Sequence, residues 1–494
     1  MCPLLQSMSA GMVLADETQT AKAKESDMRY IGIQHRRKKT AAGEARPTRV
    51  CIVTEVDNVT EYDLEDEMSE LDFLHGIFPV EFRSVQETDD ISALKPSHIK
   101  WRKLKKDESP EEIPENLRRM DGKVCMVVDK VASTYDGLKS GDVAGMVLGG
   151  SGDRFAYALS RRGEDVGASV YRLPSFALKN MREALSQDKD DDAALLAKLV
   201  AGKQEDFYIV NRRERALIQL NQAYRDRMDA MKARMGCEQR IHQNLVGQIF
   251  CSEEGQYPQG TIEVLYQQAK ANDKILQGYI AEEDMRNKSL VKILNQLSIY
   301  EDLFQPIDGV GPAIAARLIV AIRDIRRFAT DAKLKAYLGV HVMNGGKYGE
   351  RPTNKQFVRR RAGEVANWQD DGRQALYLLV DQFNRHPDSV WGKKLREVKA
   401  RLREKHPEVV EVEGKKRYTD GHIHKMGLWR TATKFTRWLW QEWTRLETKP
   451  EYVQQVKQAR LDREQAERDV AKQKRQAKKQ QAQQPEIADN QTAQ

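Results

Sequence analysis

The segment Ile307-Asp-Gly-Val-Gly-Pro-Ala-Ile-Ala-Ala-Arg-Leu-Ile-Val-Ala-Ile322 decides the fold prediction for the C-terminal part of the chain. Gly309 and Gly311 predict a tight turn, and the apolar residues after it recur at helical spacing from Ile314 onward. This pattern is typical of a helix-hairpin-helix, in which glycines let the backbone approach a phosphate and the helix start favours an anion. We therefore predict nucleic-acid contact at Gly309, Gly311 and Arg317. The alternative is a turn that serves only as a helix start.

Composition sets broad limits on the rest of the chain. With 494 residues and 40% hydrophobic types, the chain is long enough for several domains. No apolar run approaches the ~20 residues that cross a bilayer, so we expect no membrane-spanning segment. The formal net charge of +8 suits a polyanionic partner, although the excess is modest for this length. The five cysteines form no CxxC pair, which argues against a zinc ribbon and a disulfide scaffold and fits a reducing cytoplasm.

Short apolar runs predict strands between residues 29 and 200, and amphipathic helical stretches lie among them. This alternation indicates an α/β domain over residues 28–205, preceded by a disordered leader over 1–27. The acidic stretch Glu61–Asp72 and the charged, proline-rich stretch Lys95–Pro114 are expected to be surface insertions. The predicted strands are Tyr30–Ile33, Val50–Val53, Val124–Val128, Gly145–Leu148 and Ala168–Tyr171.

The pattern becomes helical over Asn211–Ile249 and Thr261–Phe304, which predicts a coiled-coil arm over residues 206–304. Such an arm either joins copies into a homodimer or homotetramer or forms an internal two-helix hairpin. Residues 305–448 are expected to form a mainly helical C-terminal domain, and 449–494 a polar helical or disordered tail. The predicted seam residues are Leu290, Ile293, Leu297, Tyr300 and Phe304.

Three further segments resemble a known family. After the glycine turn come Arg327-Phe328, then Leu334-Lys-Ala-Tyr-Leu-Gly339, then Arg373-Gln-Ala-Leu-Tyr-Leu-Leu379. Together they resemble the C-terminal domain of the DEDD-type insertion-sequence transposases, the bridge-RNA-guided relatives of the Piv invertase. The resemblance implies DNA transposition or site-specific recombination, with DNA and a structured non-coding RNA as partners, in the cytoplasm or nucleoid of a bacterium or archaeon. It also implies an N-terminal domain similar to RuvC and ribonuclease H.

The family's nucleophilic serine, which follows the Tyr-Leu-Gly segment, is replaced here. The corresponding position is Asn344 in Met343-Asn-Gly-Gly-Lys347. An amide has no hydroxyl to deprotonate and cannot act as an alkoxide nucleophile. Thr353 is the nearest downstream hydroxyl, but its Pro-Thr-Asn context does not match the motif.

The family's metal-binding carboxylates are also largely replaced. The resemblance implies Mg²⁺ held by acids at strand ends and on a helix, because Mg²⁺ prefers hard oxygen ligands. Gln34 stands at the first acidic position and Leu148 at the second. Asp192 matches a helix acid and is the one expected metal ligand, whereas Lys189 occupies its partner position.

Other acids could complete the metal site. Asp188 lies one helical turn before Asp192 and is a candidate catalytic partner, although the acidic run could equally be a solvated helix start. If the match between this sequence and the family's acidic positions were shifted, Asp57 and Asp129 would be the candidate metal ligands. Mg²⁺ is expected only if the protein is catalytic.

Basic clusters fit a phosphate-binding role, although each one alone is commonly a solvated face. His422 and His424 alternate, but no further ligand lies at metal-binding spacing, so stacking or phosphate contact is favoured there over a metal. The basic candidates are Lys347, Arg359, Arg360, Arg361, Lys393 and Lys394, with further clusters at 36–39 and 415–417.

Four functions remain open at this point: a working transposase, an inactive descendant that regulates through RNA-guided or plain DNA binding, a junction resolvase, and an actin-like-fold ATPase. The ATPase interpretation takes Leu148-Gly-Gly-Ser-Gly-Asp153 as a phosphate loop that opens a helix. Its glycine spacing fits no P-loop.

Overall fold

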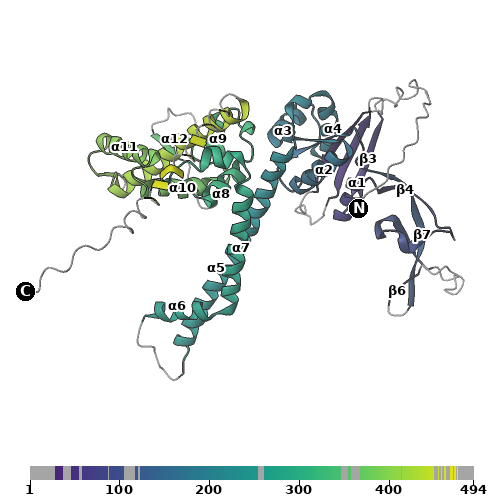
Figure 1. The fold of residues 1–494 in the computed structure, drawn as a ribbon, viewed down its shortest axis with the longest axis horizontal. Helices are drawn as coiled ribbons and strands as arrows, with labels where there is room; N and C mark the ends of the chain where they lie inside the picture. Colours follow the sequence, from purple (N-terminus) through teal and green to yellow (C-terminus); the bar gives the residue numbers. More distant parts are fainter. Residues whose placement is uncertain are drawn as a thin grey trace, which may run out of the picture. The chain divides into compact units, whose positions relative to one another are not determined.

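A computed structural model describes residues 28–36, 46–54, 58–86, 88–104, 117–120, 123–253, 261–345, 354–357, 368–412, 414–449 and scattered positions between 454 and 476. The chain divides into two compact units, Met1–Arg215 and Ala216–Gln494 (Figure 1). In the part of the chain that is described, no helix is both long and apolar enough to span a membrane.

The first unit is built on a six-stranded mixed sheet with the order β10-β9-β8-β1-β2-β3. Strands β1, β2 and β3 form an antiparallel meander, whereas β8 runs parallel to β1 and β9 runs parallel to β8. Ile31 and Ile33 of β1 are fully buried in the centre of the sheet. The strands are β1 (Arg29–Gln34), β2 (Thr48–Thr54), β3 (Val59–Leu64), β8 (Val143–Leu148), β9 (Ser169–Pro174) and β10 (Tyr208–Ile209).

Helix α4 (Asp192–Gly202) packs against β1 and β2 at very short range. A side chain at Gly32 would place its Cβ 1.9 Å from the carbonyl oxygen of Ala193, so only glycine allows this approach. The contact fixes the first residue of α4, Asp192, near the end of β1. The other helices of the unit are α1 (Glu67–His75), α2 (Asp153–Val166), α3 (Ser175–Ala184) and the short turns η1 (Ile91–Ala93), η2 (Pro96–His98), η3 (Lys189–Asp191) and η4 (Gln204–Asp206).

A second sheet in the first unit was not expected from the sequence. It has the order β4-β7-β5, with β6 also paired to β7, and the predicted strand Val124–Val128 belongs to it. The strands are β4 (Phe78–Ser84), β5 (Ile99–Lys103), β6 (Leu117–Met120) and β7 (Lys123–Asp136).

The acidic stretch Glu61–Asp72 is not a surface insertion. It supplies most of β3 and the first residues of α1, and the carboxylate of Asp72 is fully buried. Lys95 and Ser97 donate to that carboxylate at 2.9 and 2.6 Å, which offsets the cost of burying its charge. The prediction was wrong because charged residues paired inside the fold have the same composition as a solvated loop.

The second unit is mainly helical (Figure 1), and its described residues include two short two-stranded antiparallel sheets. Its core joins residues from α5, α7, α8, α10, α11 and α12, and the fully buried Trp443 packs edge-on against Phe304. The elements are α5 (Arg212–Phe250, which begins in the first unit), α6 (Ile262–Asn272), α7 (Lys274–Leu294), a π-helical turn η5 (Tyr300–Phe304), α8 (Pro312–Ile322), η6 (Ile325–Arg327), α9 (Asp331–Tyr337), β11 (Val342–Gly345), β12 (Asn354–Phe357), α10 (Asp370–Arg385), α11 (Val390–Lys405), β13 (Val410–Val412), β14 (Lys415–Arg417) and α12 (Asp420–Thr448).

The predicted coiled-coil seam differs in the structure. Helix α7 ends at Leu294, so Leu297, Tyr300 and Phe304 lie beyond it, and all three are buried in the core of the second unit. Helices α5 and α7 are joined by an ion pair between Arg234 Nε and Glu283 Oε2 at 2.6 Å. These contacts are internal to one chain, and the expected oligomer stays a prediction.

Candidate functional site

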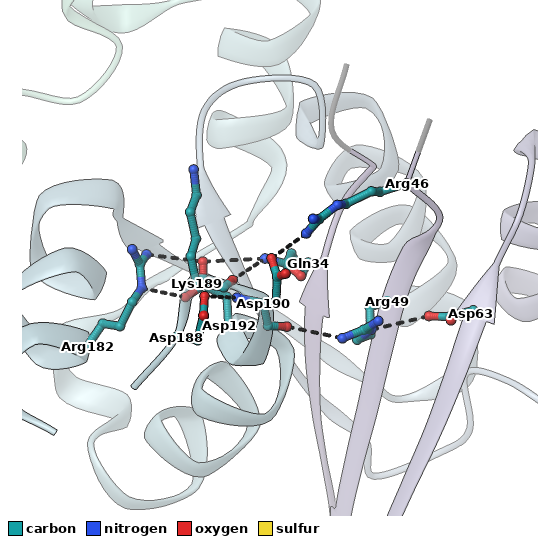
Figure 2. A network of polar contacts seen from close by, with 9 residues as sticks. All are labelled: Gln34, Arg46, Arg49, Asp63, Arg182, Asp188, Lys189, Asp190 and Asp192. Atoms are coloured by element: carbon teal, nitrogen blue, oxygen red, sulfur yellow. Dashed lines mark hydrogen bonds and ion pairs between the residues drawn. The ribbon is translucent and has the colours of Figure 1, made fainter. Parts of the chain in front are cut away.

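The end of β1 and the beginning of α4 bring two of the predicted site residues together. The Gln34 side-chain amide donates to the backbone carbonyl of Lys189 at 2.8 Å, and the same nitrogen lies 3.5 Å from Asp192 Oδ2 (Figure 2). Gln34, Lys189 and Asp192 line one pocket of about 260 Å³. The residue matched to the family's second acid, Leu148, is the last of β8 and is buried.

An arginine that sequence analysis did not identify binds the one matched carboxylate. Arg182, on α3, donates through Nε to Asp192 Oδ1 at 2.8 Å and through Nη2 to Oδ2 at 3.1 Å (Figure 2). The Asp192 side chain is only 6% exposed. The guanidinium therefore neutralises a buried charge in the fork geometry that arginine provides. No local sequence pattern links Arg182 to Asp192.

The residues at this edge do not fit Mg²⁺. Both oxygens of Asp192 are engaged by Arg182, and the side chain of Gln34 presents its nitrogen to them. Mg²⁺ needs near-octahedral oxygen ligation, usually through more than one carboxylate. Among the residues that the structure describes, no cluster of three His, Cys, Asp or Glu side chains could hold a metal ion.

The neighbouring acids are engaged elsewhere. Asp188 caps η3 by accepting from the Asp190 N–H at 3.2 Å, and Asp190 in turn accepts from Arg46 (Figure 2). Asp129 lies on β7 of the second sheet, where its carboxylate is 3.5 Å from Arg102 Nε. Asp57 lies outside the described residues.

The glycine loop after β8 opens a helix, as the sequence predicts. Gly149 and Gly150 have φ of 90° and 91°, values that few other residues adopt. Helix α2 then begins at Asp153, and Gly152 gives it no side-chain cap. Asp153 itself is buried and pairs with Arg172 at 2.9 Å, so its carboxylate is a structural partner.

In the second unit, the two glycines of the turn differ in their surroundings. Gly309 has φ of 86°, and an added Cβ would lie 3.0 Å from Gln382 Cβ. Gly311 is the N-cap of α8 and has open space where a side chain would begin. Arg317 is 12% exposed and donates to Asp371 at 2.8 Å, so its guanidinium is engaged inside the unit.

The remaining predicted residues are only partly described. Asn344 lies on β11 opposite Lys355 of β12, and its side chain is not described. Lys393 is exposed on α11, whereas Lys394 Nζ lies 4.3 Å above the Trp391 ring. His422 Nδ1 accepts the Tyr418 N–H at 3.0 Å, a structural role for that ring. Lys347, Thr353, Arg359, Arg360 and Arg361 lie outside the described residues.

The fold and the site thus define a protein with a mixed α/β unit and a helical unit that contains a glycine turn before α8. Residues 301–353, which include this turn, α8, α9 and β11, match the family model described as Transposase IS116/IS110/IS902 family. This segment is therefore similar to an insertion-sequence transposase family. No curated protein matches the chain significantly.

Proposed function

We propose that this protein is a DEDD-type, Piv-like member of the family that binds DNA together with a structured guide RNA, and that the family's metal-dependent strand exchange is impaired in it. The observation that carries the proposed impairment of strand exchange is the ion pair between Arg182 and Asp192, the one carboxylate that matches an acidic position of the family. A guanidinium held by Asp192 neutralises its charge, but it does not coordinate a water or lower the pKa of that water as a metal ion does.

The strand order supports a ribonuclease H-like assignment for the first unit. Such sheets combine an antiparallel three-stranded meander with parallel strands added beside its first strand. The strands β3-β2-β1-β8-β9 have this order and these directions. In this arrangement the end of β1 and the start of α4 are the places where acids would meet, and Gln34 and Asp192 occupy them.

DNA binding is supported by the family match and by the turn before α8. The N-cap of α8 is Gly311, which has no side chain to cap the helix, so no capping side chain blocks the approach of an anion to this helix start. The open space at Gly311 leaves room for a phosphate to approach the backbone. Phosphate contact of this kind fixes a protein on nucleic acid without reading sequence.

The proposal is tested by separating binding from strand exchange. The purified protein is incubated with DNA carrying the flanks of its own gene, with the RNA that copurifies from native cells, and with Mg²⁺. We expect a salt-dependent complex and one enriched RNA, but no recombinant junctions by sequencing. An Arg359/Arg360/Arg361 triple-alanine variant should lose the RNA. Junctions that form in the wild type and vanish in Asn344→Ala would show that family chemistry survives.

A further inference from the structure

Three side chains beside the pocket of the first unit form a chain of contacts that the family resemblance does not explain. Ser151 Oγ lies 3.0 Å from His35 Nδ1, and His35 Nε2 lies 3.3 Å from Glu70 Oε1. His35 directly follows β1, Ser151 lies in the glycine loop after β8, and Glu70 belongs to α1. Residues far apart in the sequence thus bring a hydroxyl, an imidazole and a carboxylate into consecutive contact.

The exposed fraction of the side chain decreases from the serine to the histidine to the glutamate, as expected for a nucleophile that faces solvent and an acid that is held inside the fold. Ser151 is exposed, the His35 side chain is 16% exposed, and the Glu70 side chain is 9% exposed. The carboxylate of Glu70 is held in place because Thr48 Oγ1 donates to it at 2.6 Å and Arg36 Nε lies 3.3 Å away. A fixed acid on one ring nitrogen selects the tautomer that leaves the other nitrogen free to accept a proton from serine.

The backbone around Ser151 provides the second requirement of such a site, a place for negative charge. Ser151 lies two residues before α2, a helix whose N-cap Gly152 has no capping side chain. N–H groups at a helix start stabilise developing negative charge on an attacked group. Gly152 also permits the close approach of the base, because a Cβ there would lie 3.1 Å from His35 Cβ.

We propose that Ser151, His35 and Glu70 form a nucleophilic triad that attacks a phosphodiester of a bound nucleic-acid strand; the choice of substrate rests on the proposed function. Lys189 and the glycine loop line the same pocket of about 260 Å³, which suits an anionic group, whereas the charge of Arg182 is balanced by Asp192. These three residues belong to the first unit, whereas Asn344, the position at which the family has its nucleophile, belongs to the second.

The reaction balances without a metal or an oxidant. His35 Nδ1 takes the proton of Ser151 Oγ, the Oγ–P bond forms, and the P–O bond to the leaving strand breaks. His35 then gives the proton to the leaving oxygen, which becomes a free hydroxyl. The product is a phosphodiester between Ser151 and the nucleic acid, with the same charge as the phosphodiester that was attacked. Attack by the released hydroxyl re-forms the original strand, whereas attack by a water releases the strand from the serine.

A purely structural role is the competing explanation. The Ser151 hydroxyl has one proton, and besides His35 Nδ1 it can donate to the backbone carbonyl of Arg36, which lies 3.1 Å away. In that state Ser151 would only tie the glycine loop to the end of β1. Reactivity of the hydroxyl separates these two roles.

The first test measures the reactivity of Ser151 in the full-length protein. The protein is treated with a biotinylated fluorophosphonate, and modified peptides are identified by mass spectrometry. We expect label on Ser151, none there in Ser151→Ala, and labelling roughly 100-fold slower in His35→Gln, the size of effect a general base supplies. Ser175→Ala is the matched control, because Ser175 lines the same pocket. In this variant the rate at which the reagent labels Ser151 should be unchanged.

The second test measures transfer from DNA. A duplex with a bridging phosphorothiolate, whose thiol leaves readily and rejoins poorly, is mixed with the protein, and covalent adducts are resolved under denaturing conditions. DNA binding is measured in parallel by fluorescence anisotropy, and folding by circular dichroism. An adduct on Ser151 supports the triad. Binding without an adduct, or no fluorophosphonate label on Ser151, overturns it, whereas absence of DNA binding would instead overturn the proposed function.

Discussion

The guanidinium of Arg182 donates to both carboxylate oxygens of Asp192, at 2.8 and 3.1 Å. This contact occupies the only carboxylate that the sequence places at a matched position of the family's metal site. A cation that is part of the chain cannot exchange with solvent, and it stabilises the fold whether or not nucleic acid is bound.

Replacing Arg182 by alanine should destabilise the first unit by about 3 kcal/mol, because it leaves a buried carboxylate without its guanidinium. Urea unfolding followed by circular dichroism measures this change. The double variant Arg182→Ala/Asp192→Asn should recover most of the loss, since it removes the uncompensated charge. Equal loss in the single and double variants would show that packing of the arginine, and not the ion pair, is responsible.

Wild-type protein should bind no Mn²⁺ at the edge of β1, and a redesigned site should bind one ion. The triple variant Gln34→Asp/Arg182→Ala/Lys189→Asp releases Asp192 and supplies two further carboxylates in the lining of the same pocket. Electron paramagnetic resonance of free Mn²⁺ gives the number of bound ions. The matched control carries Gln34→Asn instead of Gln34→Asp beside the same two other substitutions, and it should bind more weakly. Mn²⁺ binding by the wild type that disappears in Asp192→Asn would refute the assignment.

The two glycines before α8 should separate stability from DNA binding. Gly309→Ala should cost about 2 kcal/mol, because φ is 86° and the new Cβ would lie 3.0 Å from Gln382 Cβ. Gly311→Ala meets open space and should cost less than about 1 kcal/mol, but its Cβ would occupy the space through which we propose that a phosphate approaches. We expect roughly tenfold weaker DNA binding for Gly311→Ala, a change of about 1.4 kcal/mol. Unchanged affinity, measured by anisotropy, would exclude phosphate contact at this turn.

Adjacent lysines on α11 allow a paired test of electrostatic DNA contact. Lys393 is exposed, whereas the Lys394 ammonium lies 4.3 Å above the Trp391 ring. If Lys393 contacts a phosphate, Lys393→Ala should lower the slope of log affinity against log salt by about 1. Lys394→Ala is expected mainly to lower the free energy of unfolding, because its cation–π contact is lost, and to change the salt slope little. A slope that is the same in Lys393→Ala and the wild type would remove this residue from the interface.

Much of the main sheet could be predicted from the apolar runs alone. The runs at Tyr30–Ile33 and Val50–Val53 lie inside β1 and β2, because buried central strands are nearly continuous in apolar residues. Strand β3 was missed because it is an edge strand with exposed acids, including Glu61 and Asp63. Edge strands follow the composition of the surface, so charge alone did not distinguish β3 from a loop.

The candidate sites could be predicted only in part. The resemblance identified Gln34 and Asp192, which are 158 residues apart, and the structure brings them together. Arg182 could not be found, because its role depends on the packing of α3 beside α4. The contact between His35 and Glu70 also joins residues distant in the sequence, and it requires α1, a helix that begins within the stretch that composition assigned to a surface insertion.

Asp142 should give the first unit a distinctive dependence on pH. Its side chain is 1% exposed, and burial raises its pKa from 3.8 to about 6, although Arg29 Nε lies 3.2 Å away. A carboxyl whose pKa is higher in the folded state stabilises the fold most below pH 4, and this stabilisation is lost as the pH rises through about 6. The shift of about two pKa units corresponds to about 3 kcal/mol at most.

The free energy of unfolding of the wild type relative to Asp142→Asn should therefore fall between pH 4 and pH 7, as measured by urea titration at each pH. The variant keeps the shape of the side chain and removes its proton equilibrium. Asp165→Asn is the control, because Asp165 is paired with Arg161 on the surface of α2, where side-chain hydrogen bonding lowers its pKa. That control should show no fall over the same range. A flat difference for Asp142→Asn would mean that Arg29 fully compensates the buried charge.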